Sequence, residues 1–289
     1  MIPCRLCSSK DPKFLFRKDD FDIVRCKSCG LLFTDADPSH ARLKEFYGEK
    51  YFRSEGMGTS YSDYHFEERA MTLNAEDRLA KIDKLKPGKG KILDVGCAAG
   101  FFLNVANRDW EVAGVELSEY AASYAVDRFG LPVRNGTLKD AGFRDKEFDV
   151  VTMWDVIEHL TDPLEDLKET RRIMKDDGLL VMTTGDVESF FAKACGKYWH
   201  LYNPSQHLSF FSKKTITDLL DKAGFKVLKI EKDGNHFTLA YLTSSLSMYY
   251  PFILTQALHK LISATSLRNL KISIDLKDII TVYCMKKQG

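Results

Sequence analysis

Four cysteines near the N-terminus form two closely spaced pairs. Two residues separate Cys4 from Cys7, two separate Cys26 from Cys29, and 18 residues lie between the pairs. Each pair can bring two thiolates to one ion, and the second pair completes a tetrahedral site. The spacing therefore predicts a closed, structural zinc site, with redox dithiols or unbound thiols as the alternatives. The segment between the pairs reads as short strands, so we expect a zinc ribbon over residues 1–36 whose stability comes from the metal.

A second set of candidate residues surrounds a tight turn. In the stretch ILDVGCAAGFFL, Asp94 ends an apolar strand, and Gly96, Cys97 and Gly100 belong to a turn of small residues before a helix. Such a turn lets the backbone approach a ligand and presents its N–H groups. In the dinucleotide fingerprint the acid comes only after the second strand, whereas Asp94 precedes the turn, which suits a ligand with an amino group. We expect Cys97 to pack in this turn and not to act as a nucleophile.

Further polar residues follow at the ends of later strands. Glu116 ends the run WEVAGVEL, 22 residues after Asp94, where a carboxylate can accept hydrogen bonds from both hydroxyls of a ribose. Trp154, Asp155 and His159 come at and after the end of the run FDVVTMW. The carboxyl ends of parallel strands meet at one edge of a sheet, so we expect all of these side chains on one rim.

The elements that position these residues alternate between strands and helices. Apolar runs of strand length are KILDV, EVAGVEL, FDVVTMW and GLLVMTT. The helical segments between them indicate parallel strands with crossover helices. Ser118 is expected to cap a helix that ends at Gly130, and Asp162 to cap one that starts at Pro163 and ends before Gly178. The pattern predicts an open, doubly wound α/β sheet with ligands beyond the carboxyl ends of its strands.

At these residues the sequence resembles a known family, the class I S-adenosylmethionine-dependent methyltransferases. The resemblance covers about residues 88–235 and 275–289, and it rests on ILDVGCAAGFFL, GVELS, FDVVTMWDVIEHLTDP and GLLVMTT in the family's order. It implies a Rossmann-like fold with a seven-stranded, mostly parallel sheet, and S-adenosylmethionine as the methyl donor.

The family also implies roles for single residues by position. The expected cofactor-binding residues are Asp94, Gly96 and Gly100 at the methionine moiety, Glu116 at the ribose, Thr137 and Leu138 near the adenine, Trp154 beside the sulfonium, and Cys97 and Leu117 in the adjoining turns. Ala98 departs from the family, which most often has Gly at this position. Ala still leaves room for close approach of the backbone, so we expect an active enzyme.

The chain also looks like a narrower group, bacterial methyltransferases with an N-terminal Cys4 zinc module that often act on nucleotide-linked or polysaccharide sugars. In such proteins a loop like residues 183–212 lies over the methyl donor and contributes to the acceptor pocket. Methyl transfer is an in-line displacement, and the proton of an acceptor hydroxyl needs a base. His207 is the first candidate for this base, His159 the second and His200 the third, and for each a purely structural role is the alternative.

Two segments outside the methyltransferase motifs carry their own expectations. Residues 37–86 should form a helical connector and active-site flap, with a long helix from about Tyr64 to Leu85. The aromatic residues Tyr47, Tyr51, Phe52, Tyr61 and Tyr64 could line a ligand entrance or pack on the main domain.

The methyltransferase domain should span residues 87–289, with a helical insertion at about 238–272. In the insertion, an apolar helix face is formed by Leu254, Leu258, Leu261 and Ile262. We expect this face to pack in the core or to form a homodimer contact, with a membrane surface as the alternative.

Composition limits the partners and the compartment. Lys and Arg total 42 against 41 Asp and Glu, so the net charge of +1 gives no global field that attracts polyanions, which argues against nucleic acid as the main partner. The chain shows no early apolar segment of a signal peptide and no run of about 18 apolar residues, so we expect no export and no membrane span. Seven cysteines then fit thiols or metal ligands in a reducing cytoplasm.

Three classes of function follow. The leading one is a methyltransferase for a small-molecule acceptor, with a sugar or a nucleotide-linked or polysaccharide sugar ahead of a quinol or other phenol. The second is a ribosomal RNA methyltransferase that recognises RNA through its zinc ribbon, although acidic residues of the ribbon offset its lysines and arginine. The third is a protein that binds the donor without catalysis.

Overall fold

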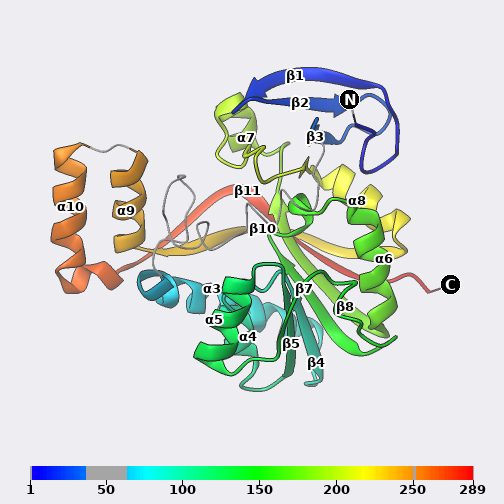
Figure 1. Ribbon diagram of the computed structural model, residues 1–289, viewed down its shortest axis with the longest axis horizontal. Helices are drawn as coiled ribbons and strands as arrows, with labels where there is room; N and C mark the ends of the chain where they lie inside the picture. Colours follow the sequence, from blue (N-terminus) through cyan, green and yellow to red (C-terminus); the bar gives the residue numbers. More distant parts are fainter. Residues whose placement is uncertain (1, 37–63, 250–251, 289) are drawn as a thin grey trace.

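The protein consists of a central sheet with helices on both faces, a small N-terminal module, and a helical hairpin that projects to one side (Figure 1). The computed structural model describes residues 2–36, 64–249 and 252–288. The expected flap residues Tyr47, Tyr51, Phe52 and Tyr61 lie outside these ranges. The long connector helix α3 (Tyr64–Leu85) has the bounds that its sequence predicts.

Seven strands form the central sheet in the order β10-β11-β8-β7-β4-β5-β6. They are β4 (Lys91–Val95), β5 (Glu111–Glu116), β6 (Val133–Asn135), β7 (Phe148–Trp154), β8 (Met174–Gly185), β10 (Phe225–Thr238) and β11 (Lys271–Lys286). β4 pairs in parallel with β5 and β7, and β11 runs antiparallel to both of its neighbours. The apolar runs of β4 and β7 are buried, because helices cover both sheet faces. The predicted doubly wound, seven-stranded and mostly parallel sheet is thus confirmed.

The helices start where their capping residues predict. α3, α4 (Phe101–Ala106) and α5 (Glu119–Phe129) cover one face, and α6 (Pro163–Ile173) and α8 (Lys213–Lys222) cover the other (Figure 1). The side chains of Ser118 and Asp162 each accept a hydrogen bond from a backbone N–H of the first helical turn. Helix α6 ends at Ile173, before Gly178 as expected, but Gly178 does not cap it, because β8 starts at Met174, which is fully buried and pairs with Phe148.

A second, antiparallel sheet contains the N-terminal module. It consists of β1 (Pro12–Lys18), β2 (Phe21–Cys26), β3 (Leu32–Thr34) and β9 (Ser209–Phe210). β9 belongs to the long loop after β8, and Phe33 and Leu32 of β3 pair with Ser209 and Phe210. The module is therefore built into the loop that leads to the candidate site, and its buried residues continue into the main core.

Strands β10 and β11 extend beyond the central sheet. Residues 279–285 of β11 pair with β8, and beyond them β10 and β11 continue as a two-stranded ribbon that pairs Thr238 with Lys271. The ribbon carries α9 (Leu239–Tyr249), α10 (Ile253–Ser263) and the short helix η3 (Ser266–Asn269). Among the described residues, no helix is both long and apolar enough to cross a bilayer.

The core packing expected for the α10 face is wrong for most of its residues, and the homodimer contact expected as the other outcome stays a prediction. Ile262 is buried, whereas Leu254, Leu258 and Leu261 are exposed, since among the described elements α10 packs chiefly against α9 and η3. The insertion therefore presents apolar side chains to solvent.

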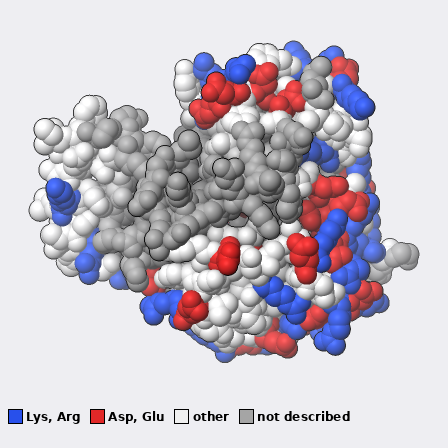
Figure 2. All heavy atoms as spheres, in the orientation of Figure 1, with Lys and Arg blue, Asp and Glu red and all other residues white. Residues whose placement is uncertain are grey.

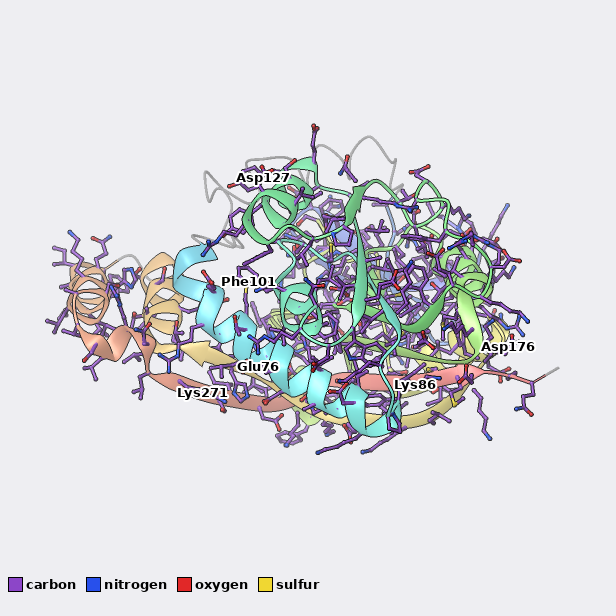
Figure 3. The ribbon with its side chains drawn as sticks, turned by 90° about the horizontal axis from the view of Figure 1, so that it is seen from below. Glu76, Lys86, Phe101, Asp127, Asp176 and Lys271 are labelled. Atoms are coloured by element: carbon purple, nitrogen blue, oxygen red, sulfur yellow. The ribbon has the colours of Figure 1, made fainter. Side chains whose placement is uncertain are left out.

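Helix α3 links the connector to the sheet. Ala75, Leu79 and Ile82 of α3 are buried in one cluster with residues of β4, α4 and β11. The side chain of Lys81 donates to Asp233 of β10 at 2.8 Å. Figure 3 shows α3 running across the molecule, with Lys86 beyond its end. These contacts fix the rotation of the helix, and with it the direction of the side chain of Arg78.

Candidate active site

One cavity opens at the carboxyl ends of the parallel strands. Its volume is about 450 Å³, which is ordinary for a small-molecule site. The walls come from the loops after β4, β5, β6 and β7 and from the loop before β9. Of the predicted donor residues, those that line the cavity are Gly96, Glu116, Leu117, Thr137, Leu138 and Trp154. His159 and His207 line the same cavity.

The turn after β4 depends on left-handed backbone. Gly96 has a φ of 70°, and a Cβ on it would lie 2.6 Å from Cγ2 of Val156. A larger residue at this position would therefore displace Val156 from the cavity wall. Ala98 has a φ of 46°, a conformation that costs an L-residue about 1–2 kcal/mol. This cost gives a physical reason for the glycine that the resembling family most often has there.

The carboxylate of Glu116 is held by two backbone N–H groups. Oε1 accepts from Ser118 at 2.7 Å, and Oε2 accepts from Ala98 at 2.9 Å. Burial raises the pKa of Glu116, and these hydrogen bonds oppose the shift. Each carboxylate oxygen can accept a second hydrogen bond. Glu116 thus keeps acceptor capacity on both oxygens, and its contact with the two hydroxyls of a ribose stays a prediction.

Asp94 lies beneath the turn and does not line the cavity. It is 2% exposed, and its Oδ1 accepts from Oγ1 of Thr152 at 2.7 Å. Burial raises the pKa of Asp94 to about 7, while the hydrogen bond from Thr152 and the charge of Arg78 oppose the shift. Contact between Asp94 and the amine of the donor stays a prediction.

Cys97 and Gly100 also lie behind the wall of the cavity. Cys97 is buried in the cluster beneath α4, and burial raises the pKa of its thiol well above the usual value. Gly100 is the N-cap residue of α4, with a φ of 80°. Both residues shape the turn, and the protonated thiol of Cys97 fits the packing role that the sequence predicts.

Arg78 does not line the cavity itself, but it contacts two residues that do, and sequence reasoning missed it. Its guanidinium carbon lies 4.5 Å from the ring centre of Trp154, and its Nη2 lies 3.7 Å from Oδ2 of Asp155. The Arg78 side chain is only 20% exposed. A cation held beside the methionine end of the predicted donor site suits the carboxylate of an amino acid. The α3 segment showed no motif that distinguishes Arg78 from other charged residues of a surface helix.

His159 and His207 form a close pair of rings on the acceptor side. Their ring centres lie 4.7 Å apart at nearly right angles. Nδ1 of His207 donates to the carbonyl oxygen of Leu201 at 2.8 Å, and Nδ1 of His159 donates to that of Gln206 at 3.2 Å. These bonds fix the tautomers and leave Nε2 of His207 unprotonated. Burial lowers the pKa of His207 to about 3 and that of His159 to about 4, so both rings are neutral near pH 7.

Glu158 lies next to this pair and was not predicted as a site residue. It is 4% exposed, and burial and the charge of Asp155 raise the pKa of its carboxyl to about 8. One atom each of Glu158, His159 and His207 lie within 4.8 Å of one another, close enough to contact one cation. The protonated carboxyl of Glu158 thus lies beside the two neutral imidazoles of His159 and His207. A proton can pass between neighbouring groups of this kind.

His200, the third candidate base, lies apart from the cavity. Its Nδ1 is 3.7 Å from Oδ2 of Asp278, an atom that also accepts from Nε1 of Trp199 at 2.7 Å. Trp199 is fully buried, so this contact anchors the loop between β8 and β9. His200 therefore belongs to the support of the loop and does not contact the cavity.

The four N-terminal cysteines converge on one point. The Sγ atoms of Cys4 and Cys29 lie 3.5 Å apart, those of Cys7 and Cys26 lie 3.4 Å apart, and all four lie within 4.8 Å of one another. In a tetrahedron with Zn–S bonds of about 2.3 Å, neighbouring sulfurs are about 3.8 Å apart. A disulfide would need about 2.05 Å. The four sulfurs thus fit a closed zinc site.

Backbone contacts join this module to His207. Oγ1 of Thr34 donates to the carbonyl oxygen of His207 at 2.8 Å, and the backbone N–H of Thr34 donates to that of Leu208 at 3.2 Å. Nη1 of Arg5 donates to the same Leu208 oxygen at 3.0 Å. On the other side, the N–H of Leu208 donates to the carbonyl oxygen of Glu158 at 2.8 Å. The N-terminal module therefore holds the backbone of a cavity residue in place.

Comparison with known proteins decides the family. A family model described as a methyltransferase domain matches residues 65–230, which is more than half of the chain. The chain belongs to this methyltransferase family. It is an S-adenosylmethionine-dependent methyltransferase of class I, and S-adenosylmethionine is its methyl donor. The cavity that Glu116 and Trp154 line is accordingly the candidate site for the donor.

Relatives of the methyltransferase are distant. An uncharacterised protein of Methanocaldococcus jannaschii is 28% identical over 49% of this chain and 67% of its own length. A ubiquinone biosynthesis O-methyltransferase of Cereibacter sphaeroides is 28% identical over 54% of this chain and 68% of its own length. These relatives support the methyltransferase domain.

Solved structures agree in fold. A methyltransferase from Archaeoglobus fulgidus has a TM-score of 0.52 at 20% identity, covering 78% of this chain and all of that one. One from Thermotoga maritima has a TM-score of 0.51 at 23% identity, covering 78% of this chain and 93% of that one. At such identities the likeness shows the fold alone.

Proposed function

We propose that this methyltransferase transfers the methyl group to a hydroxyl of a small, polyhydroxylated acceptor of the sugar or nucleotide-linked sugar class. The observation that carries the proposal is that the donor residues and a polar acceptor wall line one cavity. The acceptor wall consists of His159, Thr161, Asp162, Asp166, Gln206 and His207. Hydroxyl groups of a sugar can hydrogen-bond with the side chains of such a polar wall.

The donor supplies a methyl group on a sulfonium. Glu116 binds the ribose, Leu138 lies beside the adenine, and Trp154 excludes water from the methionine end. Arg78 holds the carboxylate of the amino acid. These contacts fix the donor, so that an acceptor oxygen on the side of His207 can approach the methyl group in line.

The proton of the acceptor hydroxyl passes to the histidine pair. Nε2 of His207 is unprotonated because Nδ1 donates to Leu201, so it is the first acceptor of the proton. Burial lowers the pKa of His207 to about 3, so its ring is neutral near pH 7 but is a weak base. His159 supports the orientation of His207 through the ring contact.

Zinc at Cys4, Cys7, Cys26 and Cys29 completes the proposal. The ion would join the loop before β1 to the loop after β2 and so hold the module together. All four positions would be occupied by thiolates, so the zinc is structural and takes no part in the chemistry.

A second candidate acceptor is an aromatic hydroxyl, such as that of a catechol. It is favoured by the similarity to a ubiquinone biosynthesis O-methyltransferase. The same donor site and the same histidine pair would serve this reaction, so the two candidates differ only in the acceptor.

The experiment is a methyl-transfer screen with the full-length protein and S-adenosylmethionine labelled in its methyl group. The acceptor panel contains nucleotide sugars, free sugars, catechols and ribosomal RNA. Label in a nucleotide sugar or sugar that is lost in His207→Ala supports the proposal. Label only in a catechol, or only in RNA, would mean that the acceptor belongs to that class and not to the sugars. No label in any acceptor, with intact binding of S-adenosylhomocysteine, would favour a donor-binding protein without catalysis.

A further inference from the structure

The hairpin of α9 and α10 exposes an apolar tip. Phe252, Ile253 and Leu254 at the start of α10 are 66%, 86% and 83% exposed. Leu246, Leu258 and Leu261 extend the apolar surface along both helices. Ile253 and Leu254 are the most exposed large aliphatic side chains among the described residues, and such a cluster of exposed apolar side chains marks an interaction site.

The Lys and Arg side chains of the insertion are not accompanied by any acidic residue. Residues 239–274 contain no Asp or Glu, in a chain with 41 of them, and they contain Lys260, Arg268 and Lys271. On the face that Figure 2 shows, the projecting lobe carries blue and white atoms but no red ones. An apolar tip with cations and without acids is complementary to a lipid surface that carries negative headgroups.

The spacing along α10 places the cations at a suitable depth. Lys260 follows Ile253 by two turns of helix, which is about 10 Å. Interfacial helices bury their apolar part about 5–10 Å into the boundary between headgroups and acyl chains. With the tip at that depth, Lys260 lies at the level of the headgroups. Arg268 and Lys271 lie still nearer the base of the hairpin, and Figure 3 shows Lys271 where β11 leaves the hairpin.

The hairpin can reach a flat surface because it projects from the body of the enzyme. In Figure 1 both helices lie beyond the end of the β10–β11 ribbon, away from the helices that cover the central sheet. Helix α10 is 11 residues long, whereas a helix that spans a bilayer needs about 20. The hairpin is therefore suited to dip into one leaflet.

A second copy of the chain fits this surface less well. A two-fold contact brings the same patch together from both copies. Lys260, Arg268 and Lys271 of each copy would then surround an interface to which residues 239–274 contribute no acid. Like charges without partners oppose such a dimer.

We propose that the apolar tip and the cations of residues 239–274 dock this methyltransferase on an anionic lipid surface. This inference does not depend on the proposed acceptor, because lipid binding is measured without turnover. The binding partner is the surface of the lipid leaflet itself. The binding is therefore expected to weaken with salt and to require negative headgroups.

The test is flotation of the full-length protein with vesicles. One set contains phosphatidylcholine with phosphatidylglycerol and the other phosphatidylcholine alone. The variants are the double substitution Ile253→Asp with Leu254→Asp, the triple substitution Lys260→Glu, Arg268→Glu and Lys271→Glu, and the control Phe190→Asp. Phe190 is 86% exposed on α7, outside the hairpin, so its substitution adds one negative charge, against two in the tip variant, at an equally exposed apolar position.

The wild type and Phe190→Asp are expected to float with the anionic vesicles. With the neutral vesicles both proteins should stay unbound at the bottom of the gradient. The tip variant should lose at least about tenfold in partitioning, and the charge variant should lose the preference for anionic vesicles. Equal unfolding temperatures and equal affinity for S-adenosylhomocysteine exclude a folding defect. The proposal is overturned if the wild type binds neither vesicle, or if the tip variant floats as the wild type does. It is also overturned if the tip substitutions convert a dimer to a monomer and no vesicle binding is seen.

Discussion

The guanidinium of Arg78 lies over the ring of Trp154, with 4.5 Å between its carbon and the ring centre. Arg78 belongs to the connector helix α3, and Trp154 ends the strand β7. The pair thus brings a cation from outside the sheet to the predicted methionine end of the donor site. The guanidinium of Arg78 also lies 3.7 Å from the carboxylate of Asp155. Its positive charge lowers the pKa of Asp94 and so opposes the effect of burial.

Replacing Arg78 by Ala should weaken the binding of S-adenosylhomocysteine by about tenfold or more, because a hydrogen bond to a charged group contributes about 1.5–3 kcal/mol. The affinity for 5′-methylthioadenosine, which has no amino acid carboxylate, should not change. Calorimetry with both ligands measures the difference, and Arg78→Lys should restore part of the loss. An equal loss for both ligands would mean that Arg78 only supports the fold of the site.

Replacing His207 by Ala should lower turnover by about 10²–10⁴-fold, because the acceptor proton loses its base. The affinity for the donor should stay the same, since His207 lies on the acceptor side of the cavity. The control is His200→Ala, which removes a histidine of the same loop that does not line the cavity. If His200→Ala lowers turnover as much as His207→Ala, the order of the two candidates is wrong.

The buried histidines should make the fold sensitive to mild acid. The pKa of His207 is about 3 and that of His159 about 4 in the folded protein, against 6.5 without the fold. Between these values the unfolded chain binds more protons, so their contribution to stability is present above about pH 6.5 and is lost as the pH falls toward 4. His207→Gln should therefore lose less stability than the wild type between pH 6.5 and 4, as measured by urea unfolding.

Glu158 should change the pH dependence of stability in the opposite direction to the two histidines. Its pKa of about 8 lies above the ordinary 4.5, so the folded state binds the extra proton and the contribution of Glu158 is lost as the pH rises toward 8. The wild-type curve sums both effects, and only the difference between wild type and variant isolates each group. Glu158→Gln should flatten the curve between pH 5 and 8 and leave the acid side unchanged. A Glu158→Gln curve that parallels the wild type would show that Glu158 is ionised in the fold.

Removal of the proposed zinc ion should affect the acceptor side more than the donor side. Thr34 and Arg5 bind the backbone at His207 and Leu208, whereas the residues of the donor turn belong to the sheet. Cys29→Ser or treatment with a chelator should lower the unfolding temperature and turnover, while S-adenosylhomocysteine still binds. Zinc is measured by mass spectrometry of the purified protein. Full activity after loss of the metal, or four cysteines without metal, would contradict this account.

Sequence patterns predicted the sheet because buried parallel strands and their caps leave strong local signals. The runs at β4 and β7 and the caps Ser118 and Asp162 are local features, and each lies where it was expected. The turn of Gly96 and the acid Glu116 were found for the same reason, since a tight turn and a strand-end carboxylate are encoded within a few residues.

The missed features depend on tertiary contacts. Arg78 looks like any charged residue of an exposed helix until α3 packs on the sheet and turns it toward Trp154. Glu158 is next to His159 in the sequence, but its raised pKa arises from burial and from Asp155. The ribbon extension of β10 and β11 and the exposed face of α10 likewise depend on what the insertion packs against, which no local pattern encodes.

The central claim is that Glu116 and its neighbours bind the adenosyl group of the methyl donor. Calorimetry of the full-length protein with S-adenosylhomocysteine tests it most directly, with 5′-methylthioadenosine and NAD as the comparison ligands. We predict that one molecule of S-adenosylhomocysteine binds per chain, that Glu116→Ala weakens it and 5′-methylthioadenosine alike by about tenfold or more, and that NAD gives no heat. Firm binding of NAD with no heat from S-adenosylhomocysteine would contradict the claim.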